Sequence, residues 1–259
     1  MNVSSWLKQA KTRIDSLDAE LILLDVLGKR ERSFLVAHDD MGISRYEKEL
    51  ERRVLRREKG EPLAYIVGRK EFFGREFLVS PEVLIPRPES EAMVEIVKKL
   101  KVRRILDVGT GSGCLAVSLK LEKPEAEVVG VDISAGALGV AKKNAEKLGA
   151  KVQFLQSDLL EKVEGDFDVI VANLPYVERD WDFISGIEFE PESALFAEDG
   201  GLFLIKKLIL EAKKRTKYLV LEADPCQHEK IVDFARTNGF EFAEKSGFVL
   251  LLVSAESDV

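Results

Sequence analysis

The chain has 259 residues, of which 46% are hydrophobic and 33% are charged, and its formal net charge at pH 7 is −7. This length and composition are typical of a globular protein with one large domain, or with an α/β domain of common size and a smaller partner. No apolar run reaches the roughly 18–20 residues of a membrane helix, the first residues carry no signal pattern, and Cys114 and Cys226 make neither a disulfide framework nor a zinc site, so we expect a reduced, cytoplasmic protein without a metal site.

The first 60 residues follow a helical pattern. Apolar side chains recur at helix spacing from Trp6 to Leu17, and Asp18 is expected to cap a second apolar helix. A third helix fits residues 44–59 and carries a basic stretch made of Arg52, Arg53, Arg56, Arg57 and Lys59. This stretch indicates either a solvated helix face or a docking face for an acidic or RNA-bound partner.

Residues 71–86 change to a strand pattern and predict a β-hairpin that turns near Ser80 and Pro81. A helix is expected to follow from Ser90 to about Leu100. The predicted organisation is a small helical domain over residues 1–70, a hairpin linker over residues 71–89 and an α/β domain over residues 90–259.

From residue 104 onward, strands and helices alternate. Strands are expected at residues 105–108, 128–132, 152–155, 168–172 and 218–222, with a final ribbon at 248–253 and helices between the strands. This alternation predicts a parallel sheet with helices on both faces. Ligands of such sheets bind outside the carboxyl ends of the strands, where the motifs below are placed.

A glycine-rich turn follows the first of these strands, in the sequence Asp107-Val108-Gly109-Thr110-Gly111-Ser112-Gly113. Glycines let the backbone turn sharply and approach a ligand closely, with the N–H groups of the next helix directed at it. The third glycine comes one residue earlier than in a dinucleotide fingerprint, and Asp107 suits a cationic cofactor better than a pyrophosphate. A structural or NAD-binding Rossmann domain is the alternative interpretation.

Three carboxylates are expected around one pocket at this end of the sheet. Asp107 precedes the turn, Asp132 ends the second strand 21 residues after Gly111, and Asp158 follows the third strand. Asp132 is placed to accept hydrogen bonds from ribose hydroxyls, and Asp158 from an adenine amino group. The set fits S-adenosylmethionine, because the sulfonium and ammonium groups of this cofactor are positive.

The fourth strand runs into Ala172-Asn173-Leu174-Pro175-Tyr176. A planar nitrogen conjugated to a carbonyl or an aromatic ring is a poor nucleophile, because its lone pair is delocalised. The side-chain carbonyl of Asn173 and the next backbone carbonyl, that of Leu174, can each accept one N–H bond from such a nitrogen, which orients its lone pair and favours positive charge on it. Pro175 stiffens the turn, and Tyr176 is placed to stack on a flat target. The segment therefore predicts methylation of a planar nitrogen, with ordinary turn chemistry as the alternative.

This segment resembles the asparagine-x-proline-tyrosine signature of nitrogen methyltransferases that act on adenine, cytosine and glutamine. Other stretches are similar to the HemK/PrmC family of release factor glutamine methyltransferases: Pro62-Leu63-Ala64-Tyr65-Ile66-Val67-Gly68, Glu71-Phe72-Phe73, Val79-Ser80-Pro81, Ile85-Pro86-Arg87-Pro88-Glu89, and Phe189-Glu190-Pro191 with Ala194-Leu195. The helical N-terminal region resembles that family too, so the resemblance covers nearly the whole chain.

The resemblance implies a seven-stranded Rossmann-like class I methyltransferase domain and a small helical domain that helps to recognise the substrate. It implies that S-adenosylmethionine is the methyl donor, with S-adenosylhomocysteine as product, and that the acceptor is the glutamine in the glycine-glycine-glutamine loop of class 1 peptide chain release factors. By the same resemblance, residues 109–113, Asp132, Leu159 and Asn173 contact the cofactor, and residues 173–176 hold the glutamine. Arg87 either covers the cofactor or braces the hairpin. We expect a monomer that binds neither a membrane nor nucleic acid.

One departure from the family keeps other functions open. The family usually has Asn-Pro-Pro-Tyr, whereas this chain has Leu174 in the middle, as in ribosomal RNA adenine dimethylases. An adenine amino-group methyltransferase acting on RNA or DNA is therefore the alternative function. Those dimethylases resemble neither residues 85–89 nor the N-terminal domain, and residues 76–259 hold 23 basic against 33 acidic side chains, which disfavours tight RNA binding. A non-catalytic nucleotide-binding module is the second alternative.

Overall fold

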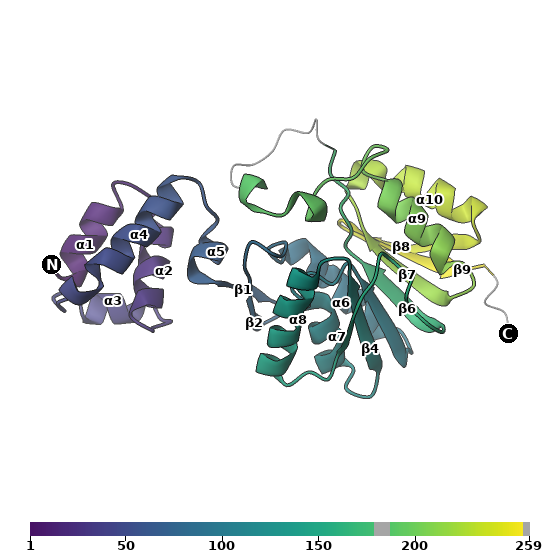
Figure 1. Cartoon of the computed structure of the whole chain (residues 1–259), viewed down its shortest axis with the longest axis horizontal. Helices are drawn as coiled ribbons and strands as arrows, with labels where there is room; N and C mark the ends of the chain where they lie inside the picture. Colours follow the sequence, from purple (N-terminus) through teal and green to yellow (C-terminus); the bar gives the residue numbers. More distant parts are fainter. Residues whose placement is uncertain (179–186, 256–259) are drawn as a thin grey trace. The chain divides into compact units, whose positions relative to one another are not determined.

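The structure, a computed structural model, describes residues 1–178 and 187–255 (Figure 1). These residues divide into two compact units: residues 1–69 with 187–189, and residues 70–178 with 190–255. Within the described residues, no helix combines the length and apolar character needed to cross a bilayer.

The first unit is helical, as predicted. It contains α1 (Val3–Ala10), α2 (Ser16–Val26), α3 (Ser33–Ala37), α4 (Glu47–Glu58, after a 3-10 turn at Ser44–Tyr46) and α5 (Leu63–Val67). Their apolar faces enclose a core that includes Trp6, Ile22, Leu23, Leu50 and Val54. The predicted cap of α2 at Asp18 is wrong. Helix α2 begins at Ser16, so its N-cap is Asp15, whose side chain accepts from Leu17 N.

The basic stretch on α4 is neutralised by acidic neighbours of the same unit. Arg53 pairs with Glu49 and with Asp25 of α2, and Arg57 pairs with Asp18. Arg52 and Arg56 pair with Glu49 and Glu61. Arg52 is exposed, whereas Arg53, Arg56 and Arg57 are partly buried in their ion pairs, so these three arginines are held within the unit rather than fully solvated.

A two-stranded hairpin, β1 (Arg69–Phe72) and β2 (Arg75–Leu78), follows α5. Its turn is at Phe73 and Gly74, whose φ angles are +50° and +68°, and the predicted turn at Ser80 and Pro81 is wrong. Two successive residues with positive φ match the right-handed twist of a tight hairpin, and the glycine supplies the second at no steric cost. The Ser80 and Pro81 pair lies after β2 instead, where Val83 N donates to the Ser80 carbonyl.

The second unit is built on one sheet of seven strands in the order β5-β4-β3-β6-β7-β9-β8, which confirms the predicted fold class. The strands are β3 (Arg104–Val108), β4 (Glu127–Asp132), β5 (Gln153–Gln156), β6 (Phe167–Ala172), β7 (Thr216–Glu222), β8 (Phe240–Ser246) and β9 (Val249–Ser254). The helices are α6 (Glu91–Lys99), α7 (Cys114–Glu122), α8 (Ala135–Leu148), α9 (Phe203–Ala212) and α10 (His228–Thr237), with 3-10 turns at Pro88–Ser90, Glu192–Ala194 and Pro225–Gln227. The 3-10 turn at Ile187–Phe189 belongs to the first unit. Strands β3 to β7 pair in parallel, and β9 is antiparallel to both β7 and β8.

Both faces of the sheet are covered by helices. Successive residues of a strand point to opposite faces, and here both are buried: Ile105 packs with α6 and α7, whereas Leu106 packs with α9 and α10. Figure 1 shows α6, α7 and α8 on one side of the sheet and α9 and α10 on the other. Strand β8 was missed by the sequence analysis because six of its seven residues are exposed, so it has no buried apolar run.

The order of the central strands fixes the place of the site. The chain crosses from β3 to β4 in one direction and later returns to β6 on the other side of β3. Val108 pairs with Val131 of β4 and with Ala172 of β6, so the turns after these three strands leave the sheet side by side. This is the topological switch point, where open α/β sheets bind their ligands.

Candidate active site

A cavity of about 270 Å³ opens at the switch point. The predicted site residues that line it are Arg87, Gly109, Thr110, Gly111, Ser112, Asp132, Asp158, Leu159, Asn173, Leu174 and Pro175. Asp107, Gly113 and Tyr176 do not line it. The structure therefore brings the two predicted motifs, 107–113 and 173–176, to one cavity.

The 107–113 turn depends on its glycines. Gly109, Gly111 and Gly113 have φ angles of +73°, +54° and +77°. A Cβ atom on Gly113 would lie 3.0 Å from the Cβ of Ala141 on α8, so only glycine allows this close approach. The backbone N–H groups of Gly109 and Thr110 donate to the Val131 carbonyl at 2.9 Å, which ties the turn to β4.

Asp107 lies beneath the turn rather than in the cavity wall. Its side chain points to the face of β3 that α7 covers, where Oδ2 accepts from Thr110 Oγ1 at 2.6 Å and from Ala116 N at 3.1 Å. Its Oδ1 is buried and has no hydrogen-bond partner among the described residues. Burial raises the pKa of Asp107 to about 7, because no cation compensates the buried charge.

The other two predicted carboxylates line the cavity. Asp132 accepts from Gly111 N and from Ser134 N, each at 2.9 Å, and burial raises its pKa. Asp158 is half-buried and pairs with Lys207 of α9 at 3.1 Å. Leu159, next to it, has a φ of +43°, a strained conformation for a leucine.

Asn173 is held from behind by two side chains. Its Nδ2 donates to Ser90 Oγ and to Glu222 Oε1, both at 3.0 Å, and Ser90 Oγ donates in turn to Glu222 Oε2 at 2.5 Å. Both Nδ2 protons are thereby used. Among the described residues, no group donates to Asn173 Oδ1 or to the Leu174 carbonyl, so both predicted acceptors remain available to a ligand.

Tyr176 does not line the cavity, although it was predicted in the catalytic set. Its hydroxyl lies 3.4 Å from Glu222 Oε1, and burial together with the nearby Glu222 charge raises its pKa. Its backbone carbonyl accepts from the buried Gln227 Nε2 at 2.9 Å, and the same group donates to the Gly200 carbonyl at 2.8 Å. These bonds fix the end of the 173–176 turn.

Arg87 lines the cavity and pairs with Glu190, so it contacts more than the hairpin. Glu190 is 7% exposed, and its other oxygen accepts from Ile85 N at 3.0 Å. Glu190 thereby joins residues 85–87 to Pro191, which also lines the cavity. The structure thus gives a physical role to two stretches, residues 85–89 and 189–191, that were matched to the family only by resemblance.

Comparison with known proteins places this site in a family. Residues 88–230 match the Methyltransferase small domain, and residues 2–68 match the PrmC N-terminal domain. The release factor glutamine methyltransferase of Neisseria gonorrhoeae is 36% identical over 94% of this chain and 92% of its own length. The chain belongs to the release factor glutamine methyltransferase family. The enzyme of that name from Koribacter versatilis is 43% identical over 78% of this chain and 75% of its own length.

Solved structures confirm the methyltransferase fold. A methyltransferase from Pyrococcus furiosus aligns with a TM-score of 0.56 and 18% identity, covering 82% of this chain and 99% of that protein. The T. thermophilus 16S rRNA N2 G1207 methyltransferase, in complex with AdoMet and guanosine, aligns with a TM-score of 0.54 and 21% identity, covering 72% of this chain and 49% of that protein. At such identities the likeness extends to the fold alone.

Four residues around the site of this family member were not singled out for a role by the sequence analysis: Ser90, Asn144, Glu190 and Gln227. Glu222 was given no role either, although it ends the strand predicted at residues 218–222. Asn144 is fully buried and bonds to Leu78 and to the Ser112 carbonyl of the 107–113 turn. The sequence signal for Asn144 was a polar residue on the apolar side of a helix. The signal for Ser90 was its position directly after residues 85–89.

Proposed function

We propose that this protein transfers a methyl group from S-adenosylmethionine to the side-chain amide nitrogen of the glutamine in the glycine-glycine-glutamine loop of class 1 peptide chain release factors. The observation that carries the proposal is the orientation of the Asn173 amide, whose Nδ2 is held by Ser90 and Glu222 while Oδ1 is left to accept. Family membership supports the choice of glutamine, since the relatives bear the name release factor glutamine methyltransferase.

The residues in the cavity wall and beneath it fit this cofactor. Asp107 lies beneath the turn, where its buried Oδ1 has no positive partner, and a sulfonium or ammonium group in the cavity would stabilise its charge across the turn. Asp132 and Asp158 retain oxygen lone pairs for ribose hydroxyls and an adenine amino group. The positive φ at Gly109 and Gly111 keeps Cβ atoms out of the turn, where a ligand must approach the backbone.

The chemistry then follows from positioning. When bound, S-adenosylmethionine supplies a methyl group whose bond to sulfur breaks as the amide nitrogen forms its new bond, leaving S-adenosylhomocysteine. Asn173 Oδ1 and the Leu174 carbonyl accept one N–H each, which holds the nitrogen and turns its lone pair toward the donor. Both oxygens also favour the positive charge that builds on the nitrogen. The nitrogen afterwards loses one proton to water, so no protein base is required.

We further propose that the helical unit over residues 1–69 helps to recognise the release factor, and that the protein acts as a cytoplasmic monomer. The match of residues 2–68 to the PrmC N-terminal domain supports the first of these roles. The ion pairs of the α4 arginines leave that helix with little net charge, which argues against binding through charge alone.

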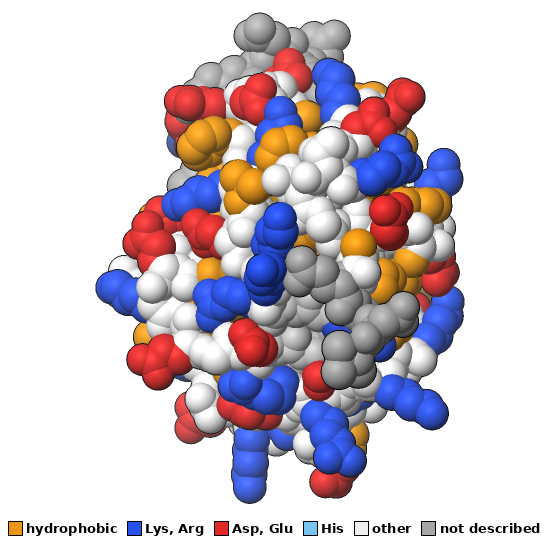
Figure 2. Space-filling view, turned by 90° about the vertical axis from the view of Figure 1, so that its right-hand side faces the viewer, with side chains coloured by type: hydrophobic (Ala, Val, Ile, Leu, Met, Phe, Trp, Pro, Cys, Tyr) orange, Lys and Arg blue, Asp and Glu red, His pale blue; other side chains and the backbone are white. Residues whose placement is uncertain are grey.

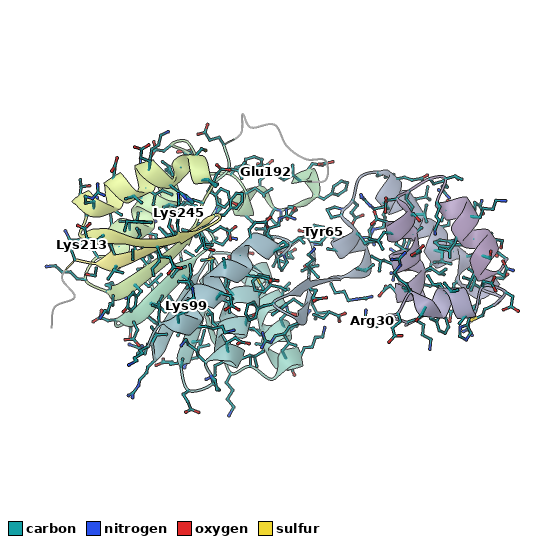
Figure 3. The ribbon with its side chains drawn as sticks, turned by 180° about the vertical axis from the view of Figure 1, so that it is seen from behind. Arg30, Tyr65, Lys99, Glu192, Lys213 and Lys245 are labelled. Atoms are coloured by element: carbon teal, nitrogen blue, oxygen red, sulfur yellow. The ribbon has the colours of Figure 1, made fainter. Side chains whose placement is uncertain are left out.

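Methylation of an adenine amino group is the second candidate, because Leu174 matches the ribosomal RNA dimethylases at that position. Specific binding of nucleic acid depends on basic side chains that follow the phosphates. Figure 2 shows acidic and basic side chains interspersed over one face of the molecule, without a large basic area. The exposed lysines Lys99 and Lys245 lie on α6 and β8, and the exposed Lys213 directly follows α9 (Figure 3). Neither observation favours a nucleic-acid substrate.

The test is methyl transfer from labelled S-adenosylmethionine to purified release factor, beside a factor whose loop glutamine is changed to alanine. We expect label on the intact factor and none on the variant. Label on ribosomal RNA or DNA instead would favour the adenine alternative. Absence of S-adenosylmethionine binding by calorimetry would favour a non-catalytic module.

A further inference from the structure

We propose that Glu222 and Ser90 are positioning residues that fix which way the Asn173 amide faces during methyl transfer. The inference rests on the proposed function, because it assigns Asn173 Oδ1 to the target nitrogen. It goes beyond that function by placing a determinant of activity on β7 and on the turn before α6, outside both sequence motifs.

The contacts form a closed arrangement around one buried carboxylate. Glu222 is 1% exposed and Ser90 is 2% exposed. Glu222 accepts from Asn173 Nδ2 on Oε1 and from Ser90 Oγ on Oε2, while Ser90 Oγ itself accepts the second Nδ2 proton. Tyr176 adds a longer bond to Oε1 at 3.4 Å. All three partners present protons to Glu222, as an acceptor-only carboxylate requires.

An asparagine amide has two orientations of nearly equal shape, and here the charge on Glu222 distinguishes them, both directly and by taking the Ser90 hydroxyl proton so that Ser90 Oγ accepts from Nδ2. With Glu222 ionised, the reverse orientation would place Asn173 Oδ1 against a carboxylate oxygen, so it is strongly disfavoured. With Glu222 protonated, its hydroxyl can donate to Oδ1, and the amide can turn its NH2 toward the substrate. A donor in that place would repel the N–H groups of the glutamine and abolish their alignment.

The surroundings make this ionisation sensitive to pH. No lysine or arginine of the described residues forms an ion pair with Glu222. The ionisable groups that act on it or are affected by it are Glu89, Tyr176 and the Cys114 thiol. Burial, and then the Glu89 charge, raise the pKa of Glu222, while the hydrogen bonds from Ser90, Tyr176 and Asn173 lower it. Activity should therefore rise with pH through a range above that of an ordinary glutamate.

The decisive variant is Glu222→Gln, which keeps the shape but offers either an oxygen or an NH2 to Asn173. We expect kcat to fall at least about tenfold while the KM for release factor and the Kd for S-adenosylmethionine change less than about threefold. The acidic limb of the pH profile should disappear. Ser90→Ala should give a smaller loss of kcat, and Glu125→Gln, an exposed change in the loop between α7 and β4, should give none.

A double-mutant cycle separates positioning from a general effect of the charge. If Glu222 acts through Asn173, adding Glu222→Gln to Asn173→Ala should change the single-turnover rate less than about twofold. If Glu222→Gln lowers the single-turnover rate as much in the Asn173→Ala background as in the wild type, the proposal is overturned, because the Glu222 carboxylate would then act on the reaction without the Asn173 amide. A wild-type rate and pH profile for Glu222→Gln would overturn it as well.

A measurement without substrate keeps this test distinct from the test of function. In nitrogen-15 NMR spectra, the Asn173 side-chain NH2, identified by its loss in Asn173→Ala, should be protected from solvent exchange in the wild type. Glu222→Gln should reduce that protection, and acidification through the raised pKa should do the same in the wild type only. If the Asn173 NH2 is not protected in the wild type, or if Glu222→Gln leaves its protection unchanged, the positioning role is overturned, whichever substrate the enzyme accepts. Protection that behaves as expected supports it, even if release factor is not methylated.

Discussion

The side chain of Leu174 lies directly against the backbone of Gly109. A Cβ atom on that glycine would be 3.0 Å from Leu174 Cδ2, closer than nearly all carbon contacts allow. The contact follows from the register of β3 and β6, in which Val108 pairs with Ala172, so that the turns after both strands diverge from the same point. The cofactor turn and the catalytic turn therefore support each other, although Gly109 and Leu174 are 65 positions apart in the sequence.

Leu174→Pro, which restores the usual family sequence, should keep activity and cost stability. The backbone carbonyl at position 174 remains, and no described hydrogen bond uses the Leu174 N–H that proline would remove. Leu174 is 4% exposed and packs in the core, so the change should lower the free energy of unfolding by about 1–3 kcal/mol. Methyl transfer should stay within about tenfold of wild type, since positioning by the carbonyl persists.

The measurements are steady-state transfer to release factor and urea unfolding, with Leu174→Ala as the matched control for lost packing. Loss of transfer in Leu174→Pro, but not in Leu174→Ala, would show that proline distorts the turn in this sequence. We expect neither variant to gain adenine methylation, and such a gain would show that position 174 helps to select the substrate.

Asn173→Ala should lower kcat on the order of 100-fold or more, because it removes one of the two preorganised acceptors for the target nitrogen. Asn173→Asp should be similarly impaired. Its second oxygen would face Glu222 Oε1, now 3.0 Å from Nδ2, and two carboxylates at that distance must share a proton. Calorimetric binding of S-adenosylmethionine should weaken far less than kcat falls. A loss confined to cofactor binding would contradict the assigned role.

The sequence allowed the motifs and the sheet to be predicted, because each depends on local pattern. A few neighbouring residues are enough to recognise each of three features: the alternation of strands and helices, the glycines at positions 109, 111 and 113, and Asn173 after a buried strand. The support behind Asn173 was not predictable, since Ser90 and Glu222 are 132 residues apart and no local pattern pairs them. Asp107 was expected in the cavity, but the alternation of side chains along β3 turns it toward α7.

Binding of S-adenosylmethionine should depend on the protonation of Asp107. Burial raises its pKa to about 7, and a cationic cofactor favours the ionised form. Affinity should therefore rise between about pH 6 and pH 8, by up to about tenfold, with release of a proton on binding. Calorimetry in buffers of different ionisation enthalpy measures that proton. The Asp107→Asn variant should bind S-adenosylmethionine weakly, and its affinity should depend less on pH over this range. If the affinity of the variant depends on pH as in the wild type, Asp107 is not the group that titrates.

The raised pKa of Asp107 also makes the stability of the protein without cofactor depend on pH. The folded-state pKa of Asp107 is above the roughly 3.9 of an unfolded aspartate, so the neutral carboxyl is the form that folding favours. The resulting contribution to stability is fully present below about pH 4 and is lost as the pH rises through about 7. Comparing the pH dependence of urea unfolding in the wild type and in Asp107→Asn isolates this contribution.

Glu190→Gln should speed the release of the cofactor. The variant weakens the charged contact with Arg87 and leaves Ile85 N with a weaker acceptor, so residues 85–87 lose part of their tie to Pro191 at the cavity. Hydrogen bonds to charged groups contribute about 1.5–3 kcal/mol, which corresponds to a rise of roughly tenfold or more in the dissociation rate. Stopped-flow displacement of S-adenosylmethionine measures this rate. Glu198→Gln, at an exposed position, is the control, and equal rates in the two variants would exclude a role for Glu190.

Asn144→Ala should be the most destabilising of these changes to the fold. Asn144 is fully buried, accepts from Leu78 N at 2.7 Å, and donates to the Leu78 and Ser112 carbonyls at 2.9 Å. Alanine would leave three buried backbone groups without partners, so the free energy of unfolding should fall on the order of 3 kcal/mol. Cofactor affinity should fall too, because Ser112 belongs to the 107–113 turn. Urea unfolding beside Asn238→Ala, a partly exposed asparagine at the end of α10, checks this. If the free energy of unfolding falls no more than in that control, the hairpin and the 107–113 turn do not depend on Asn144.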